Sequence, residues 1–128
     1  MTKTTVIAKD NEHLEKLIKE AIQAEGFKCN LNHVDVSQVT DMEGLFEHSK
    51  FNGDISAWNV ANVHNMICMF INSKFNGNLS KWNVAKVKDM WGMFRGSDFN
   101  RDIGAWDVSN VLDMGYMFRE SRFNGDLS

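Results

Sequence analysis

The sequence predicts an α/β fold, a solenoid of short parallel strands and short helices with a capping helix at its N-terminal end. Three observations support this prediction: an internal repeat of 24 residues, a change of apolar spacing within each repeat, and an amphipathic segment before the first repeat. We expect one domain with two parts. Residues 1–26 supply a strand and the capping helix, and residues 27–128 hold one degenerate, three full and one partial repeat.

The repeat can be aligned without gaps. Units begin at residues 41, 65, 89 and 113, and the degenerate copy precedes them. Apolar and aromatic residues recur at the same places in every unit, whereas other columns vary. The recurring columns include Met42, Met66, Met90 and Met114; Phe46, Phe70, Phe94 and Phe118; Phe51, Phe75, Phe99 and Phe123; and Trp58, Trp82 and Trp106. A fixed short period of this kind indicates an array whose neighbouring units share one core.

The spacing of apolar residues changes within each unit. Val63, Met66 and Met69 are three residues apart, which predicts a short helix. Trp58 and Val60 are two residues apart and therefore predict a short strand with both side chains on one face. The recurring Asn-Gly pair predicts a tight turn, because both residues tolerate a positive φ. Strands stack more closely than helices do, so we expect the array to curve with its helices outside.

The segment before the repeats predicts a strand followed by a helix. The stretch TTVIA has the composition of a short strand, and DNEHLEKLIKEAIQAEG is an amphipathic helix that begins after Asp10 or Asn11 and ends at Gly26. Phe27 opens the degenerate unit with no linker between. We therefore interpret the helix as a cap over the first unit, because an uncovered end would expose the core and a strand edge. A docking helix for a partner is the alternative.

The repeat motif resembles a known family. The pattern VxDMxxMFxxSxFNGDIxxWDVSNV, which residues 27–128 carry, is similar to the BspA-like leucine-rich repeats of mycoplasma and other bacterial surface proteins. The resemblance implies a leucine-rich-repeat-like solenoid used for protein recognition or adhesion. Surface relatives carry export signals, but the apolar run at Val6–Ala8 is too short for one. We therefore expect a cytoplasmic protein, unless a leader was removed, and no contact with a membrane.

Composition and motifs argue against catalysis. Apolar residues make up 43% of the chain and charged residues 24%, with a net charge of −3, which is typical of a soluble globular protein. Lysine and arginine form no basic stripe, so we expect no nucleic-acid partner. The four histidines fall in different columns, and Cys29 and Cys68 match no metal-binding spacing. We therefore predict no enzyme, no cofactor and no metal site.

Two surfaces are candidates for binding a partner. The first is an apolar patch on the predicted helices, in columns that vary: Ile67, Ile71, Trp91, Leu112 and Tyr116. The second is the polar face of the predicted strands: Asp35, Asn59, Lys81, Asn83 and Asp107. We expect a non-enzymatic module that binds a macromolecule, with a protein as the favoured partner. The alternative is a self-associating scaffold, and a homodimer through the uncapped C-terminal turn FNGDLS is one form of it.

Trp91 is the most informative residue of the first surface. Its column also holds Glu43, Ile67 and Gly115, so the repeat does not require tryptophan at this place. The column lies at the edge of the apolar stripe rather than at its centre. We therefore predict a partly exposed indole that leans on Ile67 or covers Gly115.

Overall fold

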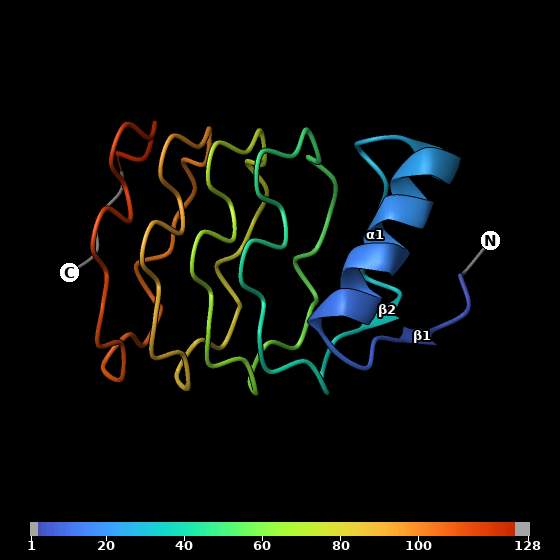
Figure 1. The fold of residues 1–128 in the computed structure, drawn as a ribbon, viewed down its shortest axis with the longest axis horizontal. Coiled ribbons are helices and arrows are strands. Elements are labelled where there is room, and N and C mark those ends of the chain that lie inside the picture. The colour runs from blue at the N-terminus through green and yellow to red at the C-terminus, as the bar shows by residue number, and fades with distance from the viewer. Residues whose placement is uncertain (1–2, 125–128) are drawn as a thin grey trace.

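The computed structural model describes residues 3–124 and shows a stack of coils with a helix at one end (Figure 1). The chain begins with strand β1 (Val6–Ile7) and helix α1 (Asn11–Glu25), followed by strand β2 (Val34–Asp35). The two strands pair in parallel, with Val6 opposite Val34. The remaining coils follow one another away from α1, each beside the previous one (Figure 1).

The predicted N-terminal strand and helix are confirmed. The Asp10 side chain accepts a hydrogen bond from the N–H of His13 at 2.8 Å and so caps the first turn of α1. Gly26 ends the helix with a φ of 90°, and its N–H donates to the carbonyl of Ile22. Only glycine adopts that backbone conformation without a steric cost, so the helix stops where the sequence indicated.

Helix α1 places its apolar stripe against the first coils. Leu14 and Ile18 are buried and belong to the same core cluster as the repeat residues. The side chain of Asn11 donates to the carbonyl of Glu43 at 3.3 Å, which fixes the start of the helix against the coil that begins at residue 41. Burial of the apolar stripe removes hydrocarbon from water at the end of the stack nearest the N-terminus.

The degenerate unit is joined to its neighbour as the later units are. The indole N–H of Trp58 donates to the carbonyl of Leu31 at 2.9 Å, and Trp82 donates to Ile55 at 3.0 Å in the next unit. This repeated bond confirms the register of the degenerate copy. Phe27 departs from the column, because its side chain is 47% exposed whereas later members such as Phe51 are fully buried.

The predicted leucine-rich-repeat-like α/β solenoid, with a short strand and a short helix in each unit, is wrong. Within residues 3–124, α1 is the only helix, and β1 and β2 are the only strands apart from isolated single-residue bridges. The expected repeat helices are runs of turns. The N–H of Phe70 donates to the carbonyl of Met93, 23 residues later, at 2.8 Å, whereas an α-helix would require Met66 as acceptor. Trp58 and Val60 likewise lie outside any strand.

Backbone hydrogen bonds in these turns alternate between two kinds of partner. Cys68 and Phe70 donate to the next coil, at the carbonyls of Trp91 and Met93. The N–H of Met69, which lies between those two donors, instead closes a turn on the carbonyl of Met66 at 3.3 Å. The backbone groups of the coil therefore find partners without forming a helix, and every second residue ties one coil to the next.

Two columns with left-handed backbone explain why no repeat helix forms. Their φ values lie between 53° and 64°, a region that interrupts a right-handed helix. The members are Gly44, Cys68, Gly92 and Tyr116 in one column and His48, Asn72, Gly96 and Glu120 in the other. Turns of this kind return the chain to the core every three or four residues, so they reproduce the apolar spacing of a helix.

The core consists of the aromatic and methionine columns that the alignment identified. Phe70 lies between Phe46 and Phe94, with ring centroids 5.4 and 5.5 Å away and ring planes nearly parallel. Most members are fully buried. The last described coil is an exception, since Phe118 is half-buried and Met114 is 37% exposed. Each coil thus depends on both neighbours to cover its apolar side chains.

The Asn and Gly columns have a structural role that differs from the predicted tight turn. The Asn52 side-chain oxygen accepts the N–H of Asn76 at 2.9 Å, and Asn76 accepts that of Asn100 at 2.8 Å, which makes a ladder along the stack. Gly53 does not have a positive φ, contrary to the prediction. Glycine is required there because a Cβ would collide with the carbonyl oxygen of Cys29 on the preceding coil.

Candidate interaction surface

Columns that vary between units lie side by side on the stack. Cys68 donates its N–H to Trp91 O at 2.9 Å, and Asn72 donates to Arg95 O at 2.7 Å, so neighbouring members of each column occupy adjacent coils. We call this surface the variable face. Its members are Glu43, Glu47, Ile67, Cys68, Ile71, Trp91, Arg95, Gly115, Tyr116 and Arg119.

The structure brings together part of the predicted apolar patch. Trp91 and Tyr116 meet edge to face, with ring centroids 5.6 Å apart and an interplanar angle of 85°, although their columns differ. Ile67 and Ile71 are half-buried on the neighbouring coil. Leu112 is 85% exposed and belongs to a separate column, outside the aromatic pair.

The predicted position of Trp91 is confirmed. Its side chain is half-buried, and a Cβ placed on Gly115 would lie 2.9 Å from Cδ1 and 3.1 Å from Nε1 of the indole. The ring therefore covers Gly115, and any larger residue at position 115 would displace it.

Sequence reasoning missed two arginines beside the aromatic pair. The guanidinium carbons of Arg95 and Arg119 lie 5.8 and 5.0 Å from the centroid of the Tyr116 ring, within the range of cation–π attraction. A signal for them was present, since their column reads Glu47, Ile71, Arg95 and Arg119 and is as variable as that of Trp91. The prediction counted only apolar members of such columns.

Charge changes sign along the variable face. Glu43 and Glu47 lie on the coil next to α1, and Arg95 and Arg119 lie on the last two described coils. Cys68 lies between these groups. Burial raises the pKa of its thiol above the ordinary value, Glu47 adds to the rise, and Arg95 opposes it. A thiol with a raised pKa is a poor nucleophile at neutral pH, so Cys68 has no activated character.

The predicted polar strand face is a corner of turns rather than a row of strands. Asp35 alone among its members lies in a strand, and Lys81 is exposed. The oxygen of each Asp or Asn member accepts the backbone N–H two residues later, a turn-forming bond. These bonds measure 2.9 Å at Asp35, 3.1 Å at Asn59, 3.0 Å at Asn83 and 3.0 Å at Asp107. The side chains therefore shape the coil, and one of their acceptor oxygens is already used.

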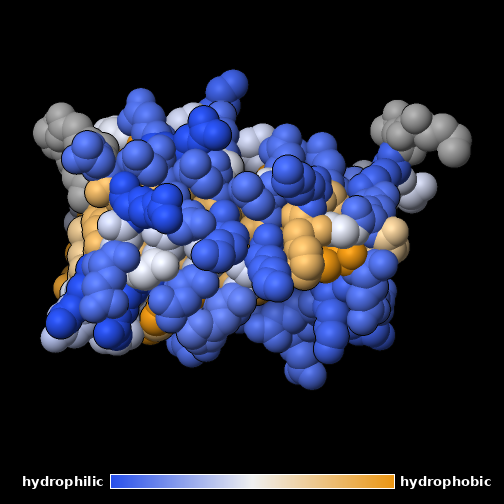
Figure 2. Space-filling model, turned by 90° about the horizontal axis from the view of Figure 1, so that it is seen from above, coloured by the Kyte–Doolittle hydropathy of each residue, from blue (hydrophilic) through white to orange (hydrophobic). Residues whose placement is uncertain are grey.

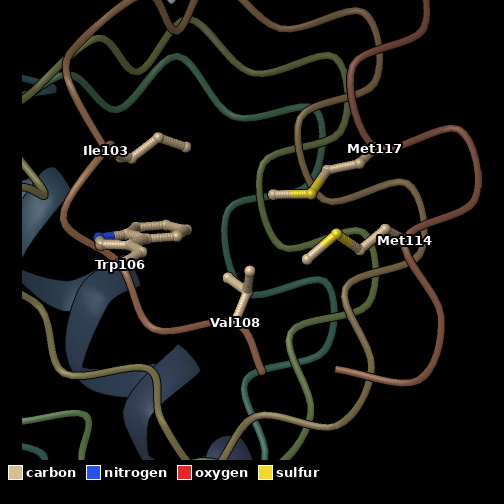
Figure 3. A pocket seen from close by; sticks show the side chains of 5 residues that line it. All are labelled: Ile103, Trp106, Val108, Met114 and Met117. Atoms are coloured by element: carbon tan, nitrogen blue, oxygen red, sulfur yellow. The ribbon is translucent and has the colours of Figure 1, made fainter. Parts of the chain in front are cut away.

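An apolar cavity of about 110 Å³ opens at the end of the stack far from α1. Ile103, Trp106 and Val108 line one side, and Met114 and Met117 point toward them from the other (Figure 3). Apolar surface is also visible at this end in Figure 2, at the left edge of the view. The predicted homodimer contact through the C-terminal turn involves residues 125–128, which lie outside the described residues.

Among residues 3–124, no group of three or more His, Cys, Asp or Glu side chains is arranged to hold a metal ion. The helix found within that range is too short and too polar to cross a membrane.

A stack of 24-residue coils with apolar core columns and a variable face defines a small tandem-repeat protein. The chain belongs to the family DUF285, described as mycoplasma proteins of unknown function, whose family model matches residues 13–128. Neither the curated proteins nor the solved structures contain a significant match. The family match thus supports the mycoplasma association of the repeat motif.

Proposed function

We propose that this protein is a non-enzymatic binding module that recognises another protein through the variable face. The observation that supports the proposal is the cluster of Trp91, Tyr116, Arg95 and Arg119, which fills columns that the fold leaves free. Tryptophan, tyrosine and arginine are the residue types that most often dominate the binding energy of protein interfaces. The resemblance of the motif to BspA-like repeats, which implies protein recognition, also supports it.

The repeat columns show that the core does not require the aromatic residues Trp91 and Tyr116. The position of Trp91 holds glutamate, isoleucine or glycine in the other units, and that of Tyr116 holds glycine at Gly44 and Gly92. Core columns such as that of Phe70 never vary within the full units. A half-exposed aromatic pair that the fold does not need is therefore a candidate anchor for a partner.

The test is a double variant, Trp91→Glu with Tyr116→Gly, made from residues that the same columns already hold. We expect its circular dichroism spectrum to match that of the wild-type protein. The wild-type protein is crosslinked to its partners in an extract of the native host, and the captured proteins are identified by mass spectrometry. The double variant should no longer capture those proteins. The matched control is Lys81→Ala, since its column contains Ala57 and Ala105. Retention of the same captured proteins by the double variant would contradict the proposal.

A further inference from the structure

The variable face has a charge pattern that is complementary to itself. Proceeding away from α1, it carries the carboxylates Glu43 and Glu47, then the apolar Ile67 and Ile71 on the next coil. Arginines follow on the third and fourth coils. The face is therefore acidic at one end, apolar near its centre and basic at the other end.

The ladder of backbone bonds fixes this order. His48 donates to Ile71 O at 2.8 Å, and Gly96 donates to Arg119 O at 2.8 Å, so each coil follows its neighbour in register. The core behind the face is equally regular, with successive phenylalanine rings 5.4 to 5.6 Å apart. A regular core holds the backbone positions of the charged residues at defined intervals. The order of charges along the variable face is therefore set by the fold.

The charged groups on the face are available for a partner. Among residues 3–124, no carboxylate forms an ion pair with Arg95 or Arg119. Glu47 lies 3.6 Å from the ring nitrogen of His48, which is charged only when protonated. The coil of Arg119 also carries the exposed carboxylates Asp113 and Glu120, and neither forms an ion pair with the two guanidiniums over Tyr116.

We propose that a second copy of this chain occupies the variable face, docked antiparallel about a two-fold axis. Such an axis makes the same patch contact itself, with the two chains running in opposite directions. The coil of Glu47 then lies opposite the coil of Arg119 of the other copy, and this ion pair forms twice. A parallel arrangement would instead oppose like charges, which is unfavourable. The inference rests on the proposed function in that it assigns a partner to the same face.

The size of the face sets the strength of the contact. Stable interfaces bury about 800 Å² on each partner, on the order of 20–30 residues. The variable face, as defined above, has far fewer residues than such an interface. The dimer should therefore be reversible and should dissociate on dilution. Its ion pairs are solvent-exposed, so added salt should weaken it.

Sedimentation equilibrium of a charge-swap cycle tests the proposal. Glu47→Arg and Arg119→Glu are suitable variants because each places in the column a residue that the column already holds. Each single variant should weaken self-association by about tenfold, since like charges then face each other twice. The double variant Glu47→Arg/Arg119→Glu, which has the net charge of the wild type, should restore it. Glu20→Arg on α1 makes the same change in net charge as Glu47→Arg and should have no effect.

Several outcomes would overturn the inference. One is a wild-type protein that stays monomeric at the highest attainable concentration. Another is a double variant that associates no better than the single variants, and a third is association that none of the charge changes alters, as a contact at the far end of the stack would give. A monomeric wild type whose captured proteins depend on Trp91 and Tyr116 would reject the dimer and keep the proposed function. Capture that ignores those residues would reject the proposed function independently.

Discussion

Replacing a phenylalanine in the middle of the stack should cost much more stability than replacing its equivalent in the last described coil. Phe70 is fully buried between two parallel rings, whereas Phe118 is half-buried and stacks on Phe94 from one side, 5.6 Å away. We choose leucine as the replacement at both positions, because it remains apolar and leaves a limited cavity. The two variants carry the same chemical change and differ only in the number of coils around them.

The expected magnitudes follow from burial. Leucine has three carbons fewer than phenylalanine, which at about 0.8 kcal/mol for each buried carbon gives about 2.4 kcal/mol. Loss of aromatic contacts on both sides of Phe70 adds about 0.5 kcal/mol or more. We therefore expect Phe70→Leu to lower the free energy of unfolding by about 3 kcal/mol. Because the ring of Phe118 is half-buried, Phe118→Leu should lower the free energy of unfolding by about 1 kcal/mol.

Urea denaturation followed by circular dichroism measures both variants. With a slope of about 1–3 kcal/mol per molar urea, a loss of about 3 kcal/mol should lower the midpoint of Phe70→Leu by about 1–3 M relative to the wild type. Phe118→Leu should lower it by well under that amount. Equal losses, or a larger loss for Phe118→Leu, would refute the reasoning that neighbouring coils share one core.

Three further results are expected. Gly53→Ala should lower stability by about 2 kcal/mol in thermal melts, because the added Cβ would collide with the Cys29 carbonyl. The control is Gly104→Ala, which should change the melting temperature little because its column holds serine in other units. Hydrogen bonds from the serine two residues later lower the pKa of Asp54 below its ordinary value of 3.8, so its contribution to stability is present above that pH and is lost as pH falls through the lower folded-state pKa. Melting temperatures of Asp54→Asn should therefore fall less below about pH 4 than those of the wild type, and equal acid sensitivity would argue against that bond. Alkylation followed by mass spectrometry should modify the half-buried Cys68 before the buried Cys29, and the reverse order would contradict the described burial.

The core and the N-terminal cap were predictable from the sequence because each follows from a repeated or local signal. Buried positions such as Met66 and Phe70 recur at a fixed period, and burial is what the fold demands at those columns. Helix α1 carries its own start and stop signals at Asp10 and Gly26. These signals do not depend on how the rest of the chain is arranged.

The secondary structure of the repeats was not predictable from apolar spacing alone. Steps of three and four residues indicate a helix only if the backbone stays right-handed throughout. Glycines at positions 44, 92 and 96 and an asparagine at 72 fill the left-handed columns, and they were the available signal against a helix. Cys68 and Tyr116 adopt the same conformation, although neither residue type favours it. The left-handed backbone of this column is therefore harder to recognise from the sequence than from the structure.

The candidate site was predicted in part for a comparable reason. Aligning the units placed Trp91 at the border of the core and against a neighbour in its own column, either Ile67 or Gly115, because both statements depend only on the column. The structure shows that the neighbour is Gly115. The arginines beside Tyr116 were missed because the partner ring lies in another column, and contacts across columns depend on the coil geometry. Asp and Asn side chains were likewise assigned to a strand face, although each accepts a bond from its own turn.

The most direct test of the stacked-coil account is a through-hydrogen-bond scalar coupling measured by NMR on the isotopically labelled protein. The measurement concerns the amide nitrogen of Phe70, whose acceptor distinguishes the two possible folds. The account predicts a coupling to the carbonyl carbon of Met93, 23 residues later, because that bond joins adjacent coils and sets the order of residues on the variable face. A coupling to the carbonyl carbon of Met66 would show a repeat helix and would contradict the account.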